Sequence, residues 1–170
     1  MKVTFKLPDE LLAQVQEDLA RPHLFAMERV GFLACRAAYA GDDLVVIASG
    51  YESIPDDEYT NDFRVGAMMG PAAIRRGMNL AYNRGAEDIS VFHVHEHPGI
   101  GIPRFSPTDS RETAKFVPDF FHVASKVPHG ALILSSGGAT GRVWLSETAD
   151  PIRVDRILSV GVPTKFLHLP

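Results

Sequence analysis

Two short apolar runs on either side of a turn limit the fold of this chain more than any other feature. They are residues 31–38 and 44–49, and Gly41-Asp42-Asp43 lies between them. Apolar runs of this length, joined by a turn that contains Gly and Asp, are typical of a β-hairpin. A second hairpin is indicated by residues 131–134 and 142–145, which flank a glycine-rich turn. The chain is therefore expected to build a sheet from strands that are distant in sequence.

Helical patterns alternate with these strands. Three helices are expected, beginning near Pro8, at Pro71 and at Ser106-Pro107. Gly85 is expected to cap the second helix. A further strand is predicted over residues 89–95, whereas residues 152–160 fit either a strand or a short helix. This mixed order predicts an α+β domain, with sheet and helices in a three-layer, α/β/α-like arrangement.

The composition predicts one globular domain over residues 1–170. Of the 170 residues, 45% are hydrophobic and 22% are charged, which is enough apolar surface for a core of its own. The net charge of −4 argues against a nucleic-acid partner, and no apolar run approaches the ~20 residues of a membrane span. The N-terminus lacks the apolar core of a signal peptide, and the only cysteine is Cys35. We therefore expect a cytoplasmic protein without disulfides, whose oligomeric state the sequence leaves open.

Three alternating histidines form the densest group of chemically active residues. His93, His95 and His97 are followed, after a Gly- and Pro-containing loop, by Ser106 and Asp109. Alternate residues of a strand share one face, so two imidazoles spaced by one residue can reach a single metal ion. An aspartate from the next loop adds an oxygen ligand. Three protein ligands and an open fourth position are the composition of a catalytic zinc site.

Zinc in such a site supports hydrolytic chemistry. It lowers the pKa of bound water to about 7 and polarises a carbonyl group. A nearby carboxylate must then move the proton, and a hydrogen-bond donor must stabilise the tetrahedral oxyanion. Such a site therefore requires one carboxylate and one donor in addition to the ligands.

These residues resemble the JAMM metalloprotease motif of the JAB/MPN family. That motif consists of a glutamate on an early strand, then H-x-H-P, a loop, and S-x-x-D. Here Glu28 precedes a glycine-containing strand, His95-Glu96-His97-Pro98 matches H-x-H-P, and Ser106-Pro107-Thr108-Asp109 matches S-x-x-D. The loop before the serine is one residue longer than the family usually has. The order of helices and strands agrees with the family from about Val3 to Leu145.

The resemblance implies roles for five residues. His95, His97 and Asp109 would be the ligands of one zinc ion per chain, Glu28 the general acid/base, and Ser106 a donor to the oxyanion. The resemblance also implies a single JAB/MPN metalloprotease domain over residues 1–170. Its fold would be a cytidine-deaminase-like mixed sheet flanked by helices.

The same resemblance predicts a zinc-dependent isopeptidase or peptidase. Its substrate would be a ubiquitin-like protein, released from a conjugate or trimmed at its C-terminal tail. Bacterial relatives accompany ubiquitin-like conjugation operons, some of them in antiphage defence. Two alternatives stay open: a non-catalytic MPN-type scaffold, and a zinc amidase or protease that acts on small peptides. The presence of every motif residue favours an enzyme over a scaffold.

Other polar residues are open to two interpretations. His93 is more typical of a core histidine, or of one beside the ligands, than of a zinc ligand, because H-x-H-P selects the later pair. The acids between Glu52 and Glu58 either select a basic substrate tail by charge or keep an exposed loop soluble. The Arg75-Arg76 pair is expected on a solvated helix face.

Overall fold

A single mixed sheet dominates the fold. The computed structural model describes residues 1–23, 27–60, 66–82 and 89–168, and the predicted helix cap Gly85 lies outside them. The strands of the sheet in this part of the chain are β1 (Val3–Pro8), β2 (Val30–Ala40), β3 (Asp43–Ser53), β4 (Ser90–Glu96), β5 (His129–Ser135), β6 (Gly138–Trp144), β7 (Ile152–Arg153), β8 (Arg156–Val160) and β9 (Lys165–His168). The helices are α1 (Asp9–Leu19), α2 (Pro71–Tyr82) and α3 (Pro107–Phe116), with the short 3-10 helices η1 (Asp56–Glu58) and η2 (Pro118–His122).

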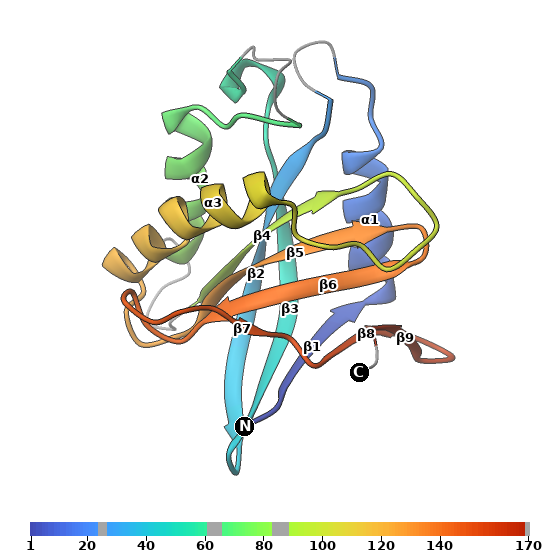
Figure 1. The fold of residues 1–170 in the computed structure, drawn as a ribbon, viewed down its shortest axis with the longest axis vertical. Helices are drawn as coiled ribbons and strands as arrows, with labels where there is room; N and C mark the ends of the chain where they lie inside the picture. The colour runs from blue at the N-terminus through green and yellow to red at the C-terminus, as the bar shows by residue number, and fades with distance from the viewer. Residues whose placement is uncertain (24–26, 61–65, 83–88, 169–170) are drawn as a thin grey trace.

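The strand order brings distant segments together. Across the sheet the order is β7-β6-β5-β4-β2-β3-β1-β8-β9 (Figure 1). β2 and β3 are antiparallel, as are β5 and β6, so both predicted hairpins are confirmed. β4 pairs parallel with β5, and β1 pairs parallel with both β3 and β8. β4 is therefore hydrogen-bonded on both sides, between β2 and β5.

The expected three-layer α/β/α arrangement, with a cytidine-deaminase-like sheet flanked by helices, is wrong. The sheet has nine strands in the described part of the chain and curls into a half-barrel, accompanied by three short helices. β1, β7, β8 and β9 extend it beyond the two hairpins and β4, and a long twisted sheet curls over its own apolar face. Among the described residues, α1 contributes only Val15 and Leu19 to the buried core on that face. Strands therefore enclose most of this core, in place of a layer of helices.

The terminal segments supply the strands that extend the sheet. β1 alternates buried and partly exposed side chains, which is the period of a strand packed on one face. The ambiguous segment 152–160 contains β7 and β8 and no helix in its described residues. Cys35 is buried in the core, as its apolar surroundings predict. Within the residues that the structure describes, no helix has both the length and the apolar character to cross a membrane.

Opposite faces of β4 contact two different groups of buried side chains. Val94 packs with residues of α1 and β1, whereas Val91 packs with residues of α2 and η2. Because side chains alternate along a strand, His93 and His95 share the face of Val91. The fold thus directs two of the three histidines toward the side of the sheet covered by α2 and α3 (Figure 1).

Candidate metal site

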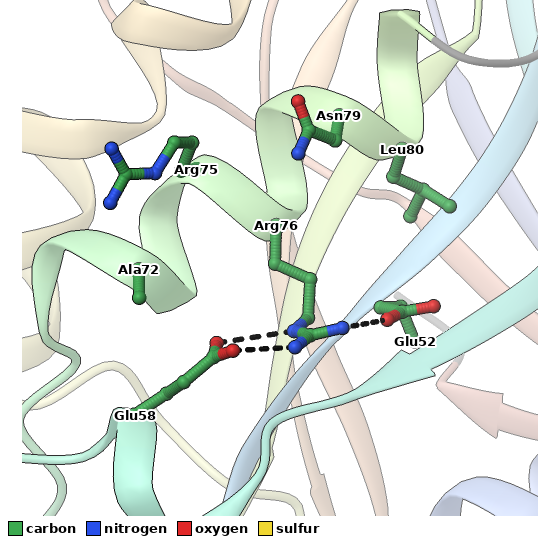
Figure 2. A pocket seen from close by; sticks show the side chains of 7 residues that line it. All are labelled: Glu52, Glu58, Ala72, Arg75, Arg76, Asn79 and Leu80. Carbon is green, nitrogen blue, oxygen red and sulfur yellow. Dashed lines mark hydrogen bonds and ion pairs between the residues drawn. The ribbon is translucent and has the colours of Figure 1, made fainter.

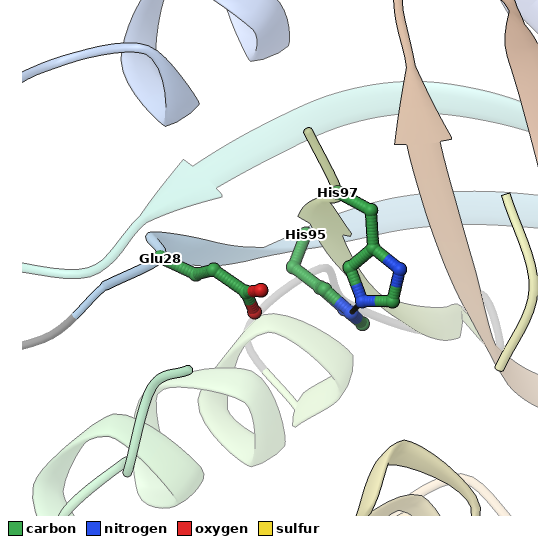
Figure 3. Close-up of side chains that lie close together, drawn as sticks. All are labelled: Glu28, His95 and His97. Carbon is green, nitrogen blue, oxygen red and sulfur yellow. Dashed lines mark hydrogen bonds between the residues drawn. The ribbon is translucent and has the colours of Figure 1, made fainter. Parts of the chain in front are cut away.

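Strand β4 and its end place two imidazoles beside each other. His95 is buried and lies opposite Val30 of β2 and Ile133 of β5. His97 follows the last residue of the strand, and its N–H donates to the carbonyl of Leu134 at 2.9 Å, which continues the pairing with β5. The Nε2 atoms of His95 and His97 lie 3.1 Å apart (Figure 3). Both rings therefore point to one position, as the alternating histidines predict.

Glu28 reaches the histidines from the segment before β2. The N–H groups of Met27 and Glu28 both donate to the carbonyl of Gly66 at 2.8 Å, which fixes the backbone beside the site. One carboxylate oxygen of Glu28 and one ring nitrogen each of His95 and His97 lie within 4.8 Å of one another. Figure 3 shows the Glu28 side chain extending toward the two imidazoles. This group of three could hold a metal ion.

Asp109 reaches the same histidines from the first turn of α3. The hydroxyl oxygen of Ser106 accepts the Asp109 N–H at 3.1 Å, and the Ser106 N–H donates to Asp109 Oδ2 at 2.7 Å, which is a complete capping box. Asp109 Oδ1 lies 3.4 Å from Nε2 of His95, and Oδ2 lies 3.4 Å from Nε2 of His97. We refer to Glu28, His95, His97 and Asp109 as the His/carboxylate cluster. Every predicted ligand and the predicted general acid/base belong to it.

The loop between the two motifs is held by the β5–β6 hairpin. Ser135 Oγ donates to the carbonyl of Gly101, and Ser136 Oγ donates to the carbonyl of Gly99, each at 2.7 Å. These bonds tie the start of the loop to the sheet. At its other end the loop leads to Asp109, which still lies 3.4 Å from both histidines despite the additional residue.

The spacing of the ligand atoms suits zinc. Zinc binds histidine nitrogen at about 2.0–2.1 Å and carboxylate oxygen at about 2.0–2.2 Å, usually with tetrahedral geometry. Two ligand atoms of a tetrahedral site then lie about 3.3–3.5 Å apart. In the cluster the two Nε2 atoms lie 3.1 Å apart, Oδ1 of Asp109 lies 3.4 Å from Nε2 of His95, and its other oxygen, Oδ2, lies 3.4 Å from Nε2 of His97. Two imidazoles with carboxylates are also a donor set that zinc accepts, so the side chains present fit this ion.

Burial and hydrogen bonding set the charge of the groups around this position. Burial raises the pKa of Asp109, but hydrogen bonds from His95 and Ser106 more than offset this effect and hold that pKa well below its usual range. Asp109 is therefore ionised at neutral pH, as a metal ligand must be. Burial lowers the pKa of His93 well below its usual value, so this imidazole is uncharged. The Nδ1 atoms of His93 and His95 are buried and make no hydrogen bond with the described residues.

The cluster lies between two cavities. One has a volume of about 250 Å³ and is bordered by Glu28, His95 and Asp109. The other has a volume of about 320 Å³ and is bordered by Glu28 and His97. Glu28 lines both, so a substrate that spans the two cavities would pass its carboxylate.

A third cavity, of about 510 Å³, lies away from the cluster between α2, η1 and the end of β3 (Figure 2). There Arg76 donates to Glu52 at 2.7 Å and to the two carboxylate oxygens of Glu58 at 2.5 and 3.1 Å. The expectation of a solvated pair is therefore wrong for Arg76, which joins three elements. Arg75 is exposed, as expected.

Two arginines pair with three of the four acids in the segment from Glu52 to Glu58. Besides the two glutamates bound by Arg76, Asp56 pairs with the buried guanidinium of Arg29 at 2.8 Å. These ion pairs connect the segment to α2 and to Arg29, the residue before β2. They support a structural role for most of its acids, in place of a charged surface for a basic tail.

Residues outside the motif hold Glu28 in position. The Tyr59 hydroxyl accepts the Val30 N–H at 2.9 Å and donates to the Val30 carbonyl at 3.1 Å. Arg29 donates to two main-chain carbonyls of the segment after α1, at 2.9 and 2.8 Å. A Cβ on Gly66 would overlap Oε2 of Glu28, so the carboxylate depends on a glycine there. No local sequence pattern identifies these residues, because each acts on a residue distant in sequence or on main-chain atoms.

Comparisons with known proteins do not supply a family for this chain. No protein-family model matches it, and no curated protein matches its sequence. Its function is therefore inferred from the geometry of the His/carboxylate cluster and from the motif that its residues form.

Proposed function

We propose that the chain is a zinc-dependent isopeptidase or peptidase that cleaves a ubiquitin-like protein from its conjugates or trims its C-terminal tail. The observation that carries the proposal is the convergence of His95, His97 and Asp109, whose ring nitrogens and carboxylate oxygens lie 3.1–3.4 Å from one another, with Glu28 beside them. The ubiquitin-like substrate is supported by the JAMM-type order of these residues in the sequence.

The residues of the cluster divide into ligands and a proton carrier. Zinc held by His95, His97 and Asp109 would supply a Lewis acid for the substrate carbonyl and would lower the pKa of water to about 7. The Glu28 carboxylate accepts a proton from the attacking water. As the C–N bond of the amide breaks, Glu28 returns this proton to the nitrogen of the leaving amine. Glu28 is suited to this task because it lines both cavities that border the cluster.

Ser106 is proposed to stabilise the oxyanion of the tetrahedral intermediate. Its hydroxyl oxygen accepts the Asp109 N–H at 3.1 Å, and its side chain also hydrogen-bonds to the Asp109 carboxylate. The serine hydroxyl has one donor hydrogen, which would turn from the Asp109 carboxylate to the oxyanion while the oxygen continues to cap α3. This second role is separable from capping by substitution.

The proposal is tested on zinc-loaded protein with two classes of substrate. The first is a ubiquitin-like protein joined through an isopeptide bond to a lysine side chain, and the second is a set of short N-acylated peptide amides. We expect cleavage of the first, its loss on chelation and its recovery on addition of zinc. If only the peptides are cleaved, the substrates are small peptides and the proposed ubiquitin-like substrate is wrong. Cleavage of neither class would contradict the enzymatic function and favour a scaffold.

A further inference from the structure

The cavity on the α2/α3 side of the cluster has mostly apolar walls. Its volume is about 250 Å³, and it opens beside Glu28, His95 and Asp109. Its apolar side chains are Val30, Ala67, Met68, Met69, Ile74 and Phe116. Three charged side chains of α3 also border it, Arg111, Glu112 and Lys115, and these are largely exposed and pair with one another. Binding cavities for small molecules are mostly apolar, with a few polar groups that fix orientation. This cavity has that character immediately beside the proposed reacting centre.

His93 lines this cavity with an aromatic surface. The His93 ring is 5% exposed and lines the cavity. It packs edge-on against Phe116, with 5.1 Å between ring centroids, and against Phe32 at 6.0 Å. A charged ligand group beside this buried ring would lose its hydration, which is costly unless a partner of opposite charge compensates it. The part of the cavity beside His93 thus favours apolar atoms of a ligand.

The size of the cavity limits what it can hold. Cavities that enclose a whole small-molecule ligand usually have volumes of about 300–1,000 Å³. A volume of about 250 Å³ is smaller and suits one side chain of a larger substrate. The cavity on the other side of the cluster differs in its walls, which include Arg29, Glu96, Gly99 and Ser136. The two sides of the reacting centre are therefore chemically different.

We propose that the cavity lined by Met69, Ile74, His93 and Phe116 is a specificity pocket for one medium-sized apolar side chain, such as leucine or methionine, on the substrate residue next to the cleaved amide. The pocket rests on the proposed function, because its position matters only if the cluster holds zinc and the amide lies there. It deepens that function by naming the substrate class: chains with a medium-sized apolar residue beside the scissile bond.

The pocket is tested by binding, without turnover. The probes are amino-acid hydroxamates, which chelate zinc and carry one side chain each: glycine, leucine, phenylalanine and glutamate hydroxamate. On zinc-loaded protein we expect leucine hydroxamate to bind about 10- to 100-fold more tightly than glycine hydroxamate, the factor that corresponds to burial of a leucine side chain. Glutamate hydroxamate should bind no more tightly than glycine hydroxamate. Equal affinities for the leucine and glycine probes would overturn the proposal.

Two substitutions on α2 identify the pocket. Ile74→Trp should remove most of the preference for leucine, whereas Ala72→Trp, on the exposed face of the same helix, should retain it. If Ile74→Trp does not fold, Ile74→Ala serves, and it should shift the preference from leucine toward phenylalanine. Unchanged preferences in the folded Ile74 variant would overturn the proposal.

These measurements distinguish failure of the pocket from failure of the proposed function. A side-chain preference in a protein that cleaves no amide would leave the pocket in place and contradict the enzymatic function. Cleavage of conjugates without a side-chain preference would contradict the pocket alone. A protein that holds no zinc at the cluster would overturn both.

Discussion

Two carboxylates approach the same pair of histidines, but the chain holds them in different ways. Asp109 is fixed by its own capping box, whose two partners lie three residues apart. Glu28 is fixed by distant residues, because its N–H donates to the carbonyl of Gly66 and the neighbouring Val30 is bound on both main-chain groups by Tyr59. The difference indicates that the proposed ligand is positioned by local sequence, whereas the proposed proton carrier depends on tertiary structure.

The largest effect is expected from Glu28→Gln, which removes the proton carrier and keeps the shape of its side chain. Turnover should fall by about 10²–10⁴-fold, the usual contribution of a general acid/base. Steady-state cleavage of the conjugate measures this loss. Asp57→Asn, in the exposed 3-10 helix η1, is the matched control and should retain wild-type turnover. Full activity of the Glu28→Gln protein would remove Glu28 from the mechanism.

Substitutions of Ser106 test the part of the site that local sequence positions, namely Asp109 and its helix cap. Ser106→Ala should lower turnover by about 10²–10³-fold through loss of the oxyanion donor. It should also lower the free energy of unfolding by about 0.5–2 kcal/mol through loss of the helix cap. Ser106→Asp keeps a capping side chain without a donor, so it should recover stability but not turnover. Recovery of both by Ser106→Asp would show that Ser106 acts only as a cap.

Acid should weaken the long-range contacts that hold β4. His129 is buried; its Nδ1 accepts the Val91 N–H at 3.0 Å, and its Nε2–H donates to the carbonyl of Ala124 at 2.8 Å. Burial lowers the pKa of His129 from 6.5 to about 4. Below pH 6.5 the His129 imidazole of the unfolded chain therefore takes up a proton, whereas in the folded protein it stays neutral down to about pH 4. The contribution to stability is complete above that pH and falls by about 3 kcal/mol as the pH drops toward 4.

Urea denaturation of the metal-free protein at several pH values between 7.5 and 4.5 measures this loss. His129→Gln should flatten the profile over the same interval, because it removes the titrating group. Stability that is constant or increases as the pH falls would contradict the prediction. Parallel profiles for wild type and His129→Gln would assign the loss to other groups.

The smallest effect is expected where a glycine supports Glu28. In Gly66→Ala the new methyl group would overlap Oε2 of Glu28 and displace the carboxylate. A displacement of about 1 Å at a reacting group costs about 10²-fold in rate, so we expect a loss of that size with zinc retained. Gly101→Ala is the matched control, since a Cβ there meets no atom within 4 Å. Equal turnover of the two variants would show that Gly66 does not position Glu28.

Local patterns predicted the parts of the molecule that carry the candidate site. The strand expected over residues 89–95 is observed as Ser90–Glu96, and the helix expected from Ser106-Pro107 begins at Pro107 with Ser106 as its cap. These predictions succeed because turn residues, apolar alternation and capping signals are contiguous in sequence. The meeting of Asp109 with the histidines followed from the motif.

The same local patterns could not predict the curled sheet. β1 has the alternation of a strand, but nothing near it indicates that Thr4 pairs with Arg156 of β8. The support of Glu28 shows the same limit, because neither Gly66 nor Tyr59 lies in a pattern that relates it to the motif. Pairing and contact between distant segments depend on the whole fold, which short windows of sequence do not contain.

The division between ligand and proton carrier is tested most directly by counting zinc. Elemental analysis after dialysis should find one zinc per chain in the wild type and in Glu28→Gln. His95→Ala and Asp109→Ala should lose the metal, while circular dichroism confirms that each variant is folded. In the alternative set of ligands, Glu28 binds the ion together with His95 and His97. That set predicts that Glu28→Gln loses the zinc and that Asp109→Ala keeps it. Full zinc in folded Asp109→Ala protein, together with its loss in Glu28→Gln, would contradict the assignment of Asp109 as ligand and Glu28 as proton carrier.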